Sequence, residues 1–171
     1  MELSSYIVRI ADKDTNALHE LYDSINKNVY AYSLSILKNH DDALEVMQDT
    51  FITIYNNADK YENQDKPMAW ILTITKNLSY MKLRKSKVTS DIDDLVFASN
   101  DNHDDKLLVK YLLDKLTKEE REIVILHVVN GFKFHEIAKL LNLKLSTTLS
   151  KYHRAIKRIK EIVKEESIWV K

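Results

Sequence analysis

Two short stretches of the sequence concentrate cations that could bind a phosphate backbone. Residues 76–88 contain five Lys or Arg side chains and residues 144–160 contain six, with no acid in either stretch. Such clusters neutralise phosphates and are typical of nucleic-acid binding. The whole chain has 26 basic and 26 acidic residues. The acidic ones prevail elsewhere, since residues 1–75 carry 6 basic and 12 acidic side chains and the charged Lys, Arg, Asp and Glu residues within 89–105 are all acidic. The zero net charge is a sum of opposed blocks and does not exclude DNA as a partner.

The second basic stretch lies within residues 134–160, which have the pattern of a helix-turn-helix. In its first helix, Ala138 is small where a second helix must cross closely. Asn142 occupies the turn position, where a left-handed backbone suits Gly or Asn. We expect Ser146 or Thr147 to cap the second helix, because their hydroxyls accept from free backbone amides.

The apolar residues of this second helix predict which of its faces is free. They recur at steps of three and four residues: Leu149, Tyr152, Ile156, Ile159 and Val163. Their burial leaves an outward face of hydroxyls and cations suited to base edges and phosphates: Thr147, Ser150, Lys151, Arg154 and Arg158. In the alternative register Thr148 is buried and Leu149 turns outward. A third interpretation is a packing unit whose basic face is merely solvated.

Enzyme chemistry finds little support in the residue types. The chain has no Cys, and its six His residues show no HExxH or other paired metal spacing. No Ser stands in a nucleophile-elbow context. We therefore expect no catalytic residue, no metal and no cofactor.

The elements that must position these residues are expected to be helices. The sequence has one Gly and one Pro, whereas hairpins and phosphate-cradling loops depend on both. Helical spacing of apolar residues begins after Asp14, a plausible N-cap, and again near Asp41. A polar segment over residues 56–65 interrupts the pattern, and Pro67 suits the first turn of the next helix.

The distribution of apolar and polar residues predicts two domains. From Ser86 to Asp105 the helical spacing lapses and Asp, Asn and Ser accumulate, which is typical of a linker. Beyond it, Thr117 to Glu120 matches a capping box that opens a helix over about residues 118–130. We predict an all-α fold with two small helical domains, 1–88 and 106–171, joined by a flexible acidic linker over 89–105.

No part of the sequence indicates export or membrane insertion. The start lacks the basic and then apolar layout of a signal peptide, and no apolar run approaches the roughly 18 residues of a membrane span. We therefore expect a cytoplasmic protein.

Three boxes give the chain a resemblance to bacterial RNA polymerase sigma factors of the two-domain, sigma-70-like extracytoplasmic-function type. Residues 42–51 read DALEVMQDTF and residues 69–77 read AWILTITKN, which resemble the family's N-terminal domain. The runs EIAKLLN at 136–142 and TTLSKYHRA at 147–155 resemble its C-terminal domain. The chain departs from the family pattern at Thr117, where Pro is usual, and at Asn142, where Gly is usual.

The resemblance implies a non-enzymatic subunit that binds core RNA polymerase and directs promoter-specific initiation. Its implied partners are promoter DNA, the beta-prime clamp helices and the beta flap of the polymerase, with an anti-sigma factor as a further candidate. Residues implied at the polymerase are Asp42, Glu45, Gln48, Asp49 and Phe51. Residues implied at the minus-ten element are Tyr61, Asn63, Lys76, Asn77, Lys82, Arg84 and Lys85. The resemblance also implies that the outward face of the last helix contacts the minus-thirty-five element. Trp70 is expected to be mainly structural.

The sequence alone is compatible with two alternatives. Phe51 alone could belong to the core and Asp49 could be a solvated acid. The whole chain could instead be a one-component helix-turn-helix regulator that binds operator DNA by itself, usually as a dimer. The first two boxes argue against that regulator, because a sensor domain has no need of them.

Overall fold

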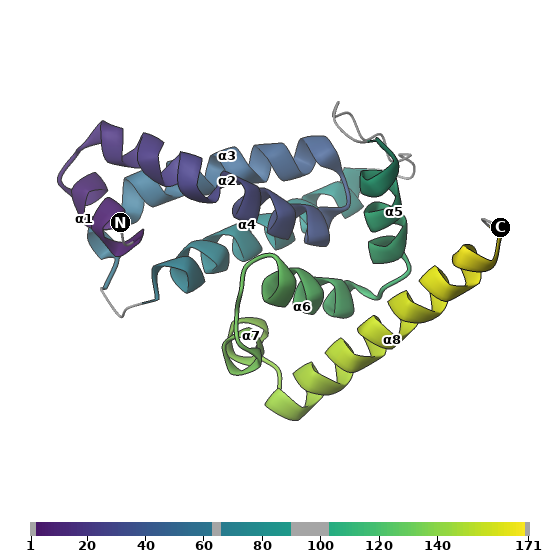
Figure 1. Cartoon of the computed structure of the whole chain (residues 1–171). Coiled ribbons are helices and arrows are strands. Elements are labelled where there is room, and N and C mark those ends of the chain that lie inside the picture. Colours follow the sequence, from purple (N-terminus) through teal and green to yellow (C-terminus); the bar gives the residue numbers. More distant parts are fainter. Residues whose placement is uncertain (1–2, 63–65, 90–102, 170–171) are drawn as a thin grey trace. The chain divides into compact units, whose positions relative to one another are not determined.

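The computed structural model describes residues 3–62, 66–89 and 103–169, and every regular element in these ranges is a helix (Figure 1). It divides into two compact units, Met1–Phe97 and Ala98–Lys171. The helices of the first unit are α1 (Leu3–Ala11), α2 (Thr15–Leu37), α3 (His40–Asn57), the short 3-10 helix η1 (Ala58–Lys60) and α4 (Pro67–Thr89). Those of the second are α5 (His103–Asp114), α6 (Lys118–Val128), α7 (Phe134–Leu141) and α8 (Leu145–Trp169).

The N-terminal helix α1 is an element that the sequence patterns did not reveal. It is only nine residues long, and Ile7 and Ile10 anchor it, each 0% exposed. The Arg9 guanidinium donates to Asp14 Oδ2 at 2.9 Å and to Glu20 Oε2 at 3.0 Å. These hydrogen bonds lower the pKa of both carboxyl groups. Arg9 therefore fastens α1 to the start of α2.

The caps expected for the first unit explain where its helices begin. Asp14 Oδ1 accepts from the amides of Asn16 at 2.9 Å and Ala17 at 3.3 Å, which confirms it as the N-cap of α2. Helix α3 starts at His40, one residue before the expected Asp41, because the Asn39 side chain is its cap. Pro67 is the first residue of α4, as expected.

The core of the first unit lies where α2, α3 and α4 pack against one another. Its largest completely buried side chains include Leu21, Tyr32, Ile54, Ile71 and Leu72. Small hydroxyl residues also lie between the helices, and two of them show how such groups are hydrogen-bonded. Ser33 Oγ donates to the Ala43 carbonyl at 3.1 Å, and Thr50 Oγ1 donates to the Val46 carbonyl at 2.7 Å. Satisfied hydroxyls of this size let the helices approach closely at little cost.

In the second unit, α6 is the central helix. Every residue from Glu120 to Leu126 is buried, and the capping box at its start is present as expected. Glu120 Oε2 accepts from the Thr117 amide at 3.0 Å, and the Glu120 amide donates to Thr117 Oγ1 at 3.4 Å. The helix ends at Val128, two residues before the expected end, and Gly131 follows with a φ of 70°.

Helices α7 and α8 form the predicted helix-turn-helix. Asn142 ends α7 with φ 55° and ψ 46°, the left-handed conformation expected at this turn. Its amide bonds to the carbonyl of Lys139 at 3.3 Å, and the next amide, of Leu143, bonds to that of Ala138 at 2.8 Å. None of the described helices is long and apolar enough to cross a membrane.

Candidate functional site

Helix α8 buries a different stripe from the one chosen from the sequence. Thr148 and Ala155 are 0% exposed, whereas Leu149 is only partly buried. The Thr148 hydroxyl donates to the Lys144 carbonyl at 3.1 Å, so its burial leaves no unpaired polar group. The preference for Leu149 as the buried residue is therefore wrong. The buried face is rotated by about 50° from the expected one, at roughly 100° per residue.

The start of α8 also differs from the expectation. The helix begins at Leu145, so Ser146 and Thr147 lie within its first turn and neither is the cap. Further along the helix, Val163 is 41% exposed, so its predicted burial is also wrong, whereas the three other predicted stripe residues contact the core. Tyr152, Ile156 and Ile159 pack on the cluster formed by Leu116, Val124 and Ala155.

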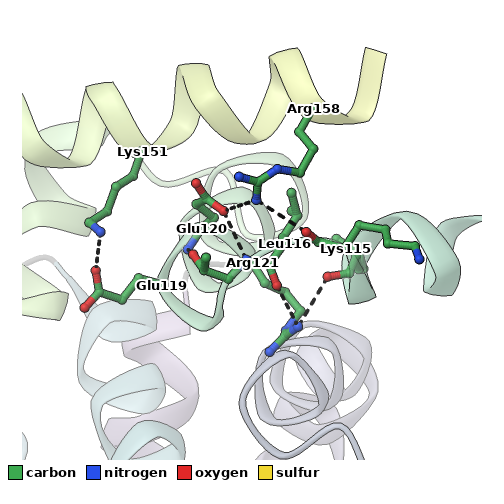
Figure 2. Close-up of polar contacts among 9 residues, drawn as sticks. Lys115, Leu116, Glu119, Glu120, Arg121, Lys151 and Arg158 are labelled. Carbon is green, nitrogen blue, oxygen red and sulfur yellow. Dashed lines mark hydrogen bonds and ion pairs between the residues drawn. The ribbon is translucent and has the colours of Figure 1, made fainter. Parts of the chain in front are cut away.

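The rotation places two of the predicted DNA-contacting cations beside α6 (Figure 2). Lys151 Nζ lies 2.7 Å from Glu119 Oε2, and the Lys151 side chain is 23% exposed. Arg158 Nη1 donates to Glu120 Oε2 at 2.8 Å and to the Lys115 carbonyl at 3.3 Å. Lys151 and Arg158 are seven residues apart, which is two helical turns, so both lie on the flank of α8 that faces the acidic first turn of α6.

Glu120 is the buried partner in this contact. Its side chain is 5% exposed, and burial alone would raise its pKa. Hydrogen bonds from Thr117 and the charge of Arg158 outweigh burial and lower the pKa of Glu120 below its usual value. Glu120 is therefore ionised at neutral pH, and Arg158 is the cation that compensates its charge.

The free surface of α8, which we call the α8 outer face, lies opposite its buried stripe. Its exposed residues on the first four turns include Ser146, Ser150, His153, Arg154 and Lys157. Ser150 and Arg154 were predicted here, and Thr147 lies at the edge, half-buried. His153 and Lys157 were not predicted, although the corrected helical register places both on this face. This face offers short polar groups near the helix start and cations beyond them, which suits a helix in a DNA major groove.

A second candidate surface runs along α3 in the first unit. Six exposed residues form this α3 face: Asp41, Glu45, Gln48, Asp49, Ile52 and Asn56. Three of the five residues predicted to contact polymerase belong to it, namely Glu45, Gln48 and Asp49. Helix α3 has four acidic side chains and no Lys or Arg, so the face suits a basic partner.

Phe51 does not belong to the α3 face. It is 5% exposed, and its ring lies against the ring of Tyr22 with the centroids 4.9 Å apart. The alternative that Phe51 is part of the core therefore holds. A helical residue that lies between Asp49 and Ile52 in the sequence can still point inward, because each residue turns the helix by about 100°.

Lys82 joins α4 to α3 through two of the predicted polymerase-contacting residues. Its ammonium pairs with Asp42 Oδ1 at 3.1 Å and with the carboxylate of Glu45. Burial lowers the pKa of Lys82, but the hydrogen bonds to Glu45 and Asp42 outweigh it and raise the pKa. Asp42 and Lys82 are thus partly engaged with each other, a pairing that residues 40 positions apart could not reveal in the sequence.

The remaining predicted minus-ten residues lie on or near α4. Tyr61 follows η1, and its ring lies 5.2 Å from that of Trp70, centroid to centroid. Of the predicted residues on α4, Asn77, Arg84 and Lys85 are exposed, and Lys76 is half-buried. Asn63 lies outside the described residues.

Within the described ranges, no group of His, Asp or Glu is arranged to hold a metal ion. The two surfaces described above are one acidic face and one basic face, on two helical units. An exposed basic face on the second helix of a helix-turn-helix defines the class of helical DNA-binding proteins.

Comparisons with known families identify the chain more closely. Sigma-70 region 2 matches residues 21–89, and sigma-70 region 4 matches residues 106–159. The chain therefore belongs to the sigma-70 family of RNA polymerase sigma factors and is of the extracytoplasmic-function type, with regions 2 and 4. It directs transcription initiation and is not an enzyme. The alternative of a one-component regulator falls, because region 2 occupies the place of a sensor domain.

Several relatives match over most of their length. The ECF RNA polymerase sigma factor SigX of Bacillus subtilis is 22% identical over 164 residues, covering 85% of this chain and 84% of SigX. The RNA polymerase sigma factor CarQ of Myxococcus xanthus is 26% identical, and the match covers 92% of this chain and 95% of CarQ.

Two solved structures share the fold. The sigma factor RpoE of Bartonella quintana, in complex with the anti-sigma factor NepR, matches with a TM-score of 0.75 and 24% identity over 85% of this chain and 96% of RpoE. CnrH, in complex with the cytosolic domain of CnrY, matches with a TM-score of 0.73 and 18% identity over 96% and 99%.

Proposed function

We propose that the α3 face docks on core RNA polymerase and that the α8 outer face reads the minus-thirty-five element of the promoter. The observation that carries this assignment is the separation of charge between the faces. The acidic α3 face lies on one unit and the cationic α8 outer face on the other, so one can meet a basic protein surface while the other meets phosphates. The cytoplasm is the proposed compartment, because it is where a bacterial polymerase works.

Docking through α3 is supported by Glu45, Gln48 and Asp49, which are exposed on one side of the helix. By resemblance to the family, their partner is the pair of clamp helices of the beta-prime subunit. Carboxylates at the rim of such an interface steer a basic partner and set the register of docking.

Promoter contact by the first unit is proposed for exposed residues in the middle and the C-terminal half of α4. Asn77, Arg84 and Lys85 are exposed there and can meet phosphates or melted strands. Tyr61, together with Asn63 two positions further along the sequence, is proposed as a receptor for an unstacked minus-ten base, and the adjacent Trp70 ring supports the position of Tyr61. Lys82 would first have to leave Asp42 and Glu45, so we place it and Lys76 second to these contacts.

Reading of the minus-thirty-five element is proposed for Ser150 and Arg154, with Thr147 at the edge and with His153 and Lys157 added by the structure. Lys151 and Arg158 act instead as positioning residues, because their ion pairs with Glu119 and Glu120 hold α8 against α6. The beta flap of the polymerase is the proposed support for this unit.

An anti-sigma factor is a further proposed partner. The Bartonella quintana relative forms a complex with an anti-sigma factor, and it shares the fold of this chain over 96% of its own length. Binding of such a partner would compete with polymerase if it covered the α3 face.

Reconstitution of the chain with sigma-free core polymerase tests both faces. We expect a double variant, Gln48→Ala with Asp49→Lys, to lose affinity for core enzyme, because it reverses a charge on the docking face. Arg154→Ala should bind core enzyme normally but lose preference among minus-thirty-five sequences, by about 1 to 3 kcal/mol for a base-edge contact.

Each variant is the control for the other. A folded double variant that retains wild-type affinity for core enzyme would refute docking through α3. If Arg154→Ala leaves sequence preference and salt dependence of initiation unchanged, the α8 outer face is not the reading surface.

A further inference from the structure

The exposed residues of α3 have a regular arrangement around the helix. At about 100° of rotation per residue, the six members of the α3 face lie within an arc of roughly 100°. Five are polar, and three of these, Asp41, Glu45 and Asp49, are acidic. Ile52 lies near the middle of the arc, between Gln48 on one side and Asp49 on the other.

Ile52 is apolar and 58% exposed, the highest exposure of any large hydrophobic residue described in the first unit. The nearby apolar residues of α3 are buried, since Phe51 is 5% exposed and Ile54 is 0% exposed. The fold of α3 therefore does not need an apolar side chain at position 52. Isolation on the surface is ordinary for one apolar residue, but a central position within an acidic face is the pattern of an interface anchor with a polar rim.

A helix-stabilising role does not explain Ile52 either. Isoleucine is a weaker helix former than alanine, glutamate or lysine, because its branched β-carbon loses rotamer freedom against the preceding turn. Exposed on a helix, Ile52 thus costs a little local stability and contributes little burial. A partner that covers it would supply the missing burial.

We propose that Ile52 is the apolar anchor of the polymerase contact. Phe51, which the family resemblance had placed at this contact, is buried in the core instead. The partner of Ile52 is a surface of core polymerase in which an apolar site is bordered by Lys or Arg, so that the site receives Ile52 while the cations meet Glu45 and Asp49. The inference rests on the proposed docking of α3 and names the apolar residue at the centre of the docking face. Anchors of this kind are few and central, and the polar rim mainly excludes water and sets the register.

The test is the affinity of the full-length chain for purified core polymerase, measured by titration at several salt concentrations. Ile52→Ala should weaken binding by about tenfold, because most of one aliphatic side chain is lost from the interface. The salt dependence of binding should stay as in the wild type, since no charge changes. Ile52→Leu should largely restore affinity.

Stability measurements separate an anchor from a structural residue. Ile52→Ala should leave the thermal midpoint of the free chain unchanged or slightly raised, because the side chain is exposed and alanine is the better helix former. Val8→Ala is the matched control, since Val8 is 49% exposed on α1 and lies outside the α3 face. We expect this control to bind core enzyme normally.

The outcomes distinguish the inference from the proposed function. Wild-type affinity of Ile52→Ala, together with weakened binding of the Gln48→Ala and Asp49→Lys double variant, would overturn the anchor and keep the docking face. Wild-type affinity of all these variants would overturn both. Equal weakening by Val8→Ala and Ile52→Ala, or a lowered thermal midpoint of Ile52→Ala, would also overturn the anchor.

Discussion

Replacement of Arg158 by Ala tests whether this residue holds the second unit together or contacts DNA. Its guanidinium donates to Glu120 Oε2 at 2.8 Å, and the Glu120 side chain is 5% exposed while that of Arg158 is 42% exposed. A hydrogen bond to a charged group contributes about 1.5 to 3 kcal/mol, and the partial exposure of Arg158 reduces this to about 1 to 2 kcal/mol. Glu120 keeps its bond from the Thr117 amide, so the loss should not exceed that range.

Native-state hydrogen exchange of the full chain can measure this loss within one unit. We expect the slowest amides of α6, around Ile123 and Leu126, to exchange about 5 to 30 times faster in Arg158→Ala. Arg154→Ala is the matched control, because Arg154 is exposed on the same helix and forms no ion pair among the described residues. Its α6 amides should exchange at the wild-type rate.

A double-mutant cycle with Glu120→Gln assigns the effect to the pair. The two changes should be non-additive, with a coupling free energy of about 1 kcal/mol, since each removes the same contact. Suppose instead that Arg158→Ala leaves the exchange of α6 unchanged and lowers the affinity of the holoenzyme for minus-thirty-five DNA. Arg158 would then be a DNA contact, and the reasoning from its ion pair would be refuted.

Two further predictions concern the second unit. Asn142→Ala should lower the free energy of unfolding by about 1 kcal/mol, because alanine tolerates the left-handed φ of 55° poorly, whereas Asn142→Gly should be close to neutral. Hydrogen exchange of the α6 amides, measured over a range of denaturant concentrations, compares the two variants. Equal stability of the two variants would contradict the strain argument. Because the pKa of Glu120 is lowered by folding, the stability that Glu120 contributes is present above about pH 4.5, its ordinary pKa, and is lost as pH falls through the lower folded value. Acid titration followed by circular dichroism should therefore show Glu120→Gln to be less sensitive to pH than the wild type below pH 4.5, and identical acid profiles would count against this role.

Signals that act between near neighbours in the chain were sufficient to place most helices. Asp14 as a cap, the Thr117 and Glu120 box, and the left-handed Asn142 were all predicted and are all present. Each depends on a side chain and a backbone group at most three residues apart, or on the conformational preference of one residue. The helical spacing of apolar residues predicted the fold class, and the family boxes, read in order along the chain, predicted the function.

Contacts between distant residues were decided by the tertiary structure. Whether Thr148 or Leu149 is buried depends on where α6 lies beside α8. Apolar spacing of three and four residues is compatible with both orientations of α8 about its axis, which differ by about 50°. The pairing of Lys82 with Asp42 and Glu45, the burial of Phe51 and the exposure of Ile52 depend in the same way on how α2, α3 and α4 pack. The sequence determines the order of side chains around a helix, but the packing of the neighbouring helices determines which face of that helix is buried.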